Sequence, residues 1–135
     1  MNVKRYFTAA FAVFVAIQIT NFIQHGLILM DEYEALKAIW NPNMMSVMWL
    51  MHLIDIPFSL LLVYIFVRGY ENKGILEGIR FGLIIGLFIW ISAAFSQWIV
   101  YPIPLCLAVK WFIFGVIQQV ICGAVIAIVY KPLSS

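Results

Sequence analysis

The sequence predicts an all-α integral membrane protein, a four-transmembrane-helix bundle that runs antiparallel, up-down-up-down, with both termini cytoplasmic. Hydrophobic residues make up 65% of the 135 residues and charged residues only 10%, and the mean hydropathy is +1.04. No water-soluble fold needs that much apolar surface. Four apolar stretches also reach the roughly 20 residues that a helix needs to cross a bilayer.

The four apolar stretches are expected to be helices, because lipid offers no partners to backbone polar groups and a helix satisfies them internally. The length allows one membrane domain, residues 1–135. The first stretch is too long and too free of charge for a cleaved secretion signal, so we expect it to stay as a span. The predicted spans are Tyr6–Leu29, Met44–Val67, Phe81–Val100 and Trp111–Tyr130.

The basic residues divide unevenly between the two sides that these spans define. Six of the eight lie on the side of the two termini, which the positive-inside rule places in the cytoplasm. The net charge of +2 is too small to indicate a nucleic-acid partner. The larger group is Lys4, Arg5, Arg68, Lys73, Arg80 and Lys131, and the smaller is Lys37 and Lys110.

The connection between the first two spans carries a short pattern of its own. Tyr33, Leu36 and Trp40 recur at i, i+3 and i+7 with charged residues between them, and Asn41-Pro42 ends the run. This pattern is typical of an amphipathic helix over about residues 31–40 that lies on the outer surface. The alternative is an ordered loop whose aromatic side chains belong to the interfacial belt.

Glycines at a strict four-residue spacing lead into the third span. Such a face of small residues lets another helix approach closely. Packing inside the same bundle is favoured over a dimer or partner interface, because a small bundle must first pack itself. The series is Gly74, Gly78, Gly82 and Gly86.

Polar side chains line one face of each of the first two spans. Lipid penalises these groups, so both faces are expected to point into the bundle. Asp55 is the only acidic residue within the spans, in the stretch His-Leu-Ile-Asp-Ile-Pro. The face of the first span is Gln18, Asn21 and His25, and that of the second is Met45, Met48, His52, Asp55 and Ser59.

Three uses of these faces are open. Asp55 could be hydrogen-bonded to Asn21, Gln18 or His52 and simply fix helix register. The same residues with His25 could form a proton, ion or small-solute site, because an ionisable group within a membrane is a functional candidate by default. Haem or copper is the third possibility, with His25 and His52 as axial haem ligands or His25, His52, Met45 and Met48 as a soft set for Cu(I).

The sequence lacks the common catalytic motifs, namely Gly-x-Ser-x-Gly, His-Glu-x-x-His, the Walker loop and Gly-x-Gly-x-x-Gly. An enzyme is therefore not favoured. We expect a small inner (plasma) membrane protein that acts as an accessory or structural subunit of a larger membrane complex. Its expected partners are the lipid bilayer and other membrane protein subunits, or a second copy. The alternative is a binding or translocating protein with a polar site between helices one and two.

Overall fold

A computed structural model describes residues 1–131, and every regular element in this part of the chain is a helix. Four helical segments are long and apolar enough to cross a membrane, which indicates a multi-pass membrane protein. The first of these segments joins α1 to the π-helical turn η1. The elements are α1 (Val3–Ile23), η1 (Gln24–Ile28), α2 (Met30–Ala35), α3 (Met44–Val47), α4 (Trp49–Arg68), α5 (Ile75–Val100) and α6 (Leu105–Val129).

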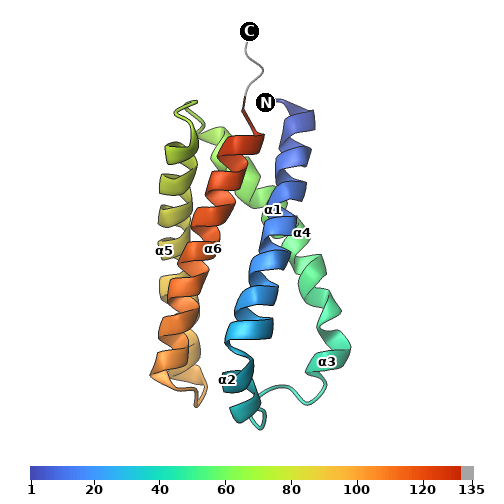
Figure 1. Ribbon diagram of the computed structural model, residues 1–135, viewed down its shortest axis with the longest axis vertical. Coiled ribbons are helices and arrows are strands. Elements are labelled where there is room, and N and C mark those ends of the chain that lie inside the picture. The colour runs from blue at the N-terminus through green and yellow to red at the C-terminus, as the bar shows by residue number, and fades with distance from the viewer. Residues whose placement is uncertain (132–135) are drawn as a thin grey trace.

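The start of α1 and the end of α6 lie at the same end of the bundle (Figure 1). The backbone N–H of Asn2 donates a hydrogen bond to the Tyr130 hydroxyl at 3.1 Å. We call this the terminal end, and it also carries the connection from α4 to α5. The opposite, distal end carries α2, α3 and the turn between α5 and α6.

The helices α5 and α6 pack with their backbones in direct contact, because glycines face each other across the pair. A Cβ atom added to Gly78 would overlap the carbonyl oxygen of Gly123, and one added to Gly82 would overlap the carbonyl oxygen of Gln119. At Gly86 the added atom would lie 3.0 Å from the Val116 Cα. Most of the predicted glycine face is therefore occupied within the chain.

Gly74 differs from the other members of the predicted series. It precedes the first residue of α5 with φ at +80°, and an added Cβ would meet nothing within 4 Å. Glycine is favoured there by the positive φ rather than by helix packing. The adjoining loop is held by Glu77, whose carboxylate accepts hydrogen bonds from the backbone N–H groups of Glu71 and Lys73 at 2.6 and 2.7 Å.

The helix α4 is packed along its terminal half and open along its distal half. Leu62, Val63 and Phe66 are buried in the main core with residues of α1 and α6. Every residue from 41 to 54 is exposed, and α4 crosses α1 and runs outward toward α3 (Figure 1). Pro57 lies near the change and has no N–H for the carbonyl of Leu53, so the helix is weakened there.

The observed helix bounds differ from the predicted ones in several places, and α5 begins at Ile75, six residues before the predicted start of the third span. The third connection is shorter than predicted, because α6 begins directly after Pro104 and takes in Lys110. A proline is tolerated at a helix start, where its missing N–H would have no partner. The predicted amphipathic helix over residues 31–40 is helical only in α2 and continues as turns, and the second span begins with the separate helix α3.

Replacing Gly82 by Ala should destabilise the protein by about 1–3 kcal/mol, because the added methyl group forces the backbones of α5 and α6 apart. Thermal unfolding in a mild detergent, followed by circular dichroism, measures the effect. Gly69→Ala is the matched control, since an added Cβ at that position meets nothing within 4 Å. Equal melting temperatures for the two variants would show that the close approach is not needed.

Candidate functional site

A hydrogen-bonded group of three side chains joins α1 to α4 near the middle of both spans. The Gln18 amide nitrogen donates to the Asp55 carboxylate at 2.9 Å, and the Gln18 carbonyl oxygen lies 2.6 Å from His52 Nδ1. One glutamine of α1 therefore binds two polar side chains of α4. We call Gln18, His52 and Asp55 the α1–α4 polar link.

The Gln18 amide sets the direction of both hydrogen bonds. Its NH₂ group faces a carboxylate, and its carbonyl oxygen can only accept a hydrogen. His52 Nδ1 must therefore carry the hydrogen that it shares with Gln18. In the neutral ring this leaves His52 Nε2 as a free acceptor.

The α1–α4 polar link lies where α4 begins to diverge from the bundle. Asp55 is half-buried and His52 is exposed, although His52 is bonded to α1. The Ser59 hydroxyl donates to the Asp55 backbone carbonyl at 2.7 Å, so Ser59 supports the helix rather than the carboxylate. The polar link thus joins α1 to α4 at the border of the exposed run, residues 41–54, in which His52 itself lies.

A second polar connection joins α1 to α6. The Gln118 amide nitrogen donates to the Thr20 hydroxyl at 2.7 Å and to the Asn21 carbonyl oxygen at 2.8 Å. Asn21 therefore faces α6, whereas its predicted neighbour Gln18 faces α4. The polar face of the first span is shared between two helices.

His25 belongs to a separate group of side chains at the distal end, centred on Tyr33. Its Nδ1 lies 2.5 Å from the Tyr33 hydroxyl, which also accepts a hydrogen bond from the Trp111 indole N–H at 2.8 Å. The indole N–H of Trp40 donates to the backbone carbonyl of Tyr33 at 3.0 Å. We call His25, Tyr33, Trp40 and Trp111 the distal aromatic cluster.

The π-helical turn η1 positions His25 in this cluster. The N–H of Leu29 reaches back five residues to the carbonyl of Gln24, so the turn that carries His25 is wider than an α-helical turn. Leu29 then inserts fully between Ile103 and Leu107, which form a small second core. This core brings α2 against the start of α6.

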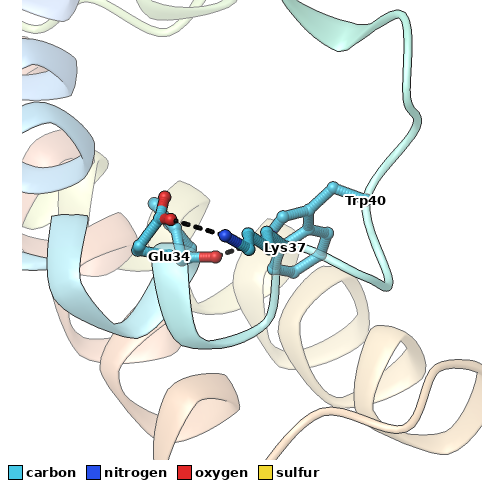
Figure 2. A network of polar contacts seen from close by, with 4 residues as sticks. Glu34, Lys37 and Trp40 are labelled. Carbon is cyan, nitrogen blue, oxygen red and sulfur yellow. Dashed lines mark hydrogen bonds and ion pairs between the residues drawn. The ribbon is translucent and has the colours of Figure 1, made fainter.

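Charged side chains reinforce the distal end unequally. Glu32 and Lys110 form an ion pair that ties α2 to α6. Figure 2 shows Lys37 folded back onto Glu34 beside Trp40, with 3.3 Å between the charged atoms. Both of these side chains are about three-quarters exposed, so their pair contributes little to stability.

The structure separates the two histidines that the sequence places together. His52 binds Gln18 and His25 binds Tyr33, so they belong to different polar groups. Met45 is 78% exposed and Met48 is 40% exposed. Within residues 1–131, no group of three His, Cys, Asp or Glu side chains is arranged to hold a metal ion. Haem or copper at these residues stays a prediction without further support.

The central role of Tyr33 is missed by reasoning from the sequence. The sequence places Tyr33 and Trp40 on one face of a short helix, but their contact is through the turns that follow α2. Trp111 lies 78 residues away in the chain, and only the fold brings its indole to the Tyr33 hydroxyl. The local signal in the sequence is the spacing of Tyr33, Leu36 and Trp40, which indicates a shared face but not the residues that this face meets.

Comparison with known protein families, with curated proteins and with solved structures finds no match to this chain.

Replacing Gln18 by Leu should destabilise the protein by about 1–2 kcal/mol, because Asp55 and His52 both lose their partner. Thermal unfolding in detergent measures this loss, and Gln97→Leu is a control at an exposed glutamine of α5. The double variant Gln18→Leu/Asp55→Leu should be more stable than Gln18→Leu alone, because no unpaired carboxylate remains. A double variant that is less stable still would contradict a pairing role for Gln18.

Tyr33 should make stability depend on pH in the alkaline range. Burial raises the pKa of Tyr33 from 10.0 to about 12, with a smaller contribution from the charge of Glu32, while the Trp111 hydrogen bond opposes the rise. Below pH 10 the Tyr33 hydroxyl keeps its proton in both the folded and the unfolded chain, so its contribution to the free energy of unfolding is intact. Between pH 10 and 12 the unfolded chain releases it first, and stability falls by up to about 1.4 kcal/mol per pH unit.

The tyrosinate absorbance of the protein, minus that of Tyr33→Phe, gives the titration of Tyr33 alone. We expect a midpoint near pH 12. Tyr33→Phe should also show a smaller fall in stability above pH 10. A midpoint near pH 10, the ordinary pKa of tyrosine, would show that the Tyr33 hydroxyl is open to water.

Proposed function

We propose that this protein is a plasma-membrane subunit with both termini in the cytoplasm, which acts by binding a transmembrane helix of a larger membrane complex. The observation that carries the proposal is the exposed run from residue 41 to residue 54, which includes the polar side chain of His52. The orientation rests on the basic residues, six of eight of which lie at the terminal end.

The proposed binding surface is α3 with the distal half of α4, residues 44–54. Four methionines, Met44, Met45, Met48 and Met51, give it flexible apolar side chains that adapt to a partner. Lipid offers no hydrogen to the free acceptor of His52, whereas a helix with a Ser, Thr, Asn or Gln side chain does. The partner is therefore expected to be an apolar helix that carries such a donor.

The glycine face does not compete for this role. Gly78, Gly82 and Gly86 are covered by α6, so a partner cannot approach the backbone of α5 along them. The opposite face of α5 carries apolar side chains such as Phe88, which is 80% exposed and suits contact with lipid. This contrast favours α4 over α5 as the face that meets protein.

A photo-reactive residue placed at Ile54 should cross-link in the native membrane to one partner polypeptide. The same residue at Phe88 is the control, because that position is exposed on α5 and is expected to meet lipid. Adding His52→Leu to the Ile54 probe should reduce the cross-linked product several-fold, since the partner loses its hydrogen-bond acceptor. Equal products from the two positions, or a protein that purifies alone in mild detergent, would refute the proposal.

The second candidate function is a small-solute or ion site at the α1–α4 polar link. The observation in its favour is that Gln18 holds a carboxylate and an imidazole at one opening in the bundle. A proton path through Gln18 is disfavoured, because an amide has no readily exchanged proton to pass between His52 and Asp55. Binding, rather than proton relay, is the use that this geometry suits.

Replacing Asp55 by Asn separates the two functions. The amide keeps the shape and an acceptor for Gln18 but removes the charge. A solute or cation site should lose at least tenfold in affinity, measured by calorimetry with the candidate solute, while the Ile54 cross-link stays unchanged. A visible absorption band or bound metal in the purified protein, lost on His52→Leu, would instead favour the redox alternative.

A further inference from the structure

A hollow opens at the terminal end, between the start of α1 and the end of α6. Its volume is about 310 Å³, and it lies at the opposite end of the bundle from α3. The polar residues on its wall come from the first turns of α1, and Val129 of α6 supplies an apolar side. Its lining is Asn2, Lys4, Arg5, Thr8 and Val129.

The two cations of this hollow have no anionic partner in residues 1–131. The ion pairs of that part of the chain use Lys37, Lys73 and Lys110, and no acidic residue lines the hollow. Lys4 and Arg5 therefore bring two uncompensated positive charges to one place. This distinguishes them from Lys73, which is paired with Glu71.

The neighbouring polar groups leave one more donor for a ligand. The side-chain oxygen Oδ1 of Asn2 accepts a hydrogen bond from the Arg5 backbone N–H at 3.1 Å, so the NH₂ group of that side chain is available. The Thr8 hydroxyl gives its hydrogen to the Lys4 carbonyl at 2.8 Å and has none to offer. The hollow thus presents two cations and an amide donor, a set that suits a phosphate group.

An apolar stripe on α1 starts directly beside these cations. Phe11, Val15 and Phe22 follow Lys4 at i+7, i+11 and i+18, which places all four on one face of the helix. Their side chains are 69%, 37% and 65% exposed. A free phosphate would make no use of this stripe, whereas an acyl chain would lie along it.

We propose that this hollow is a binding site for an anionic phospholipid, whose phosphate contacts Lys4, Arg5 and Asn2 and whose acyl chain lies on Phe11 and Val15. Inorganic phosphate shares the chemistry of the headgroup but lacks the chain. The site is independent of the proposed partner surface on α3 and α4, which lies at the opposite end of the bundle. Lipid binding and partner binding can therefore be tested separately.

Native mass spectrometry of the purified protein in mild detergent, titrated with phosphatidylglycerol, tests the proposal. Lys4→Gln/Arg5→Gln should weaken binding about 30-fold, since each basic residue near an anionic surface contributes roughly fivefold. Arg68→Gln/Arg80→Gln is the matched control, because it removes the same charge from the same end outside the hollow. The control variant should lose less than threefold in affinity for phosphatidylglycerol.

Further arms of the experiment separate lipid from phosphate. Phosphatidylcholine with the same chains should bind at least tenfold more weakly than phosphatidylglycerol, and glycerol 3-phosphate should not compete at equal concentration. Phe11→Ser should weaken the binding of phosphatidylglycerol but not that of glycerol 3-phosphate. Circular dichroism checks that each variant is folded. Equal losses in the two double variants, no preference between the lipids, or full competition by glycerol 3-phosphate would overturn the proposal.

Discussion

The contact between the backbones of α5 and α6 is the constraint on which the other helix positions depend. Glycines at Gly78, Gly82, Gly86 and Gly123 leave no side chain to hold the two backbones apart at those positions, so van der Waals contact is close over several turns. Lipid provides no hydrophobic force to drive helices together, and such contact is the main substitute. With α5 on one side, α6 presents Cys122 and Ile126 to α1 on the other.

The helix α1 is held by apolar contact at the terminal end and by polar groups farther along. Ala9 and Val13 pack fully into the core, and then Gln118 of α6 binds Thr20 and Asn21. Gln18 likewise binds α1 to α4, through its hydrogen bond to Asp55. These hydrogen bonds set the register of α1 against α6 and against α4.

The sequence predicts the four spans well because each is a long apolar run, and lipid leaves the backbone no alternative to a helix. The bounds at residues 101–110 were less predictable, since Pro104 can end one helix or begin another. Among the candidate residues, the four-residue period indicates a close helix contact at Gly78, Gly82 and Gly86, but it cannot show that Gly74 lies before the helix.

The polar faces were harder to assign, because spacing shows which residues share a side and not which helix they meet. Residues three or four apart on α1 can face two neighbours at once. Gln18 and Asn21 do so, and His25 is turned to a third partner by the wider turn of η1. The residue that closes this turn, Leu29, packs against Ile103 and Leu107, a contact between distant segments that no local pattern reveals.

The helix α4 is attached differently at its two ends. At the terminal end Leu62, Val63 and Phe66 anchor α4 in the core. At the distal end the chain reaches α3 through turns that follow the aromatic cluster, so α4 is tethered there by the connection and not by packing. On the terminal side of Pro57, the Tyr6 hydroxyl of α1 donates a hydrogen bond to the Leu60 carbonyl of α4 at 2.8 Å. On the distal side α4 is bound to α1 through Gln18. A helix fixed in this way and weakened at Pro57 can adjust the angle of its distal half at low cost. That freedom is what a surface needs in order to close on a partner helix, and the exposed run, residues 41–54, ends directly before Asp55 of the α1–α4 polar link.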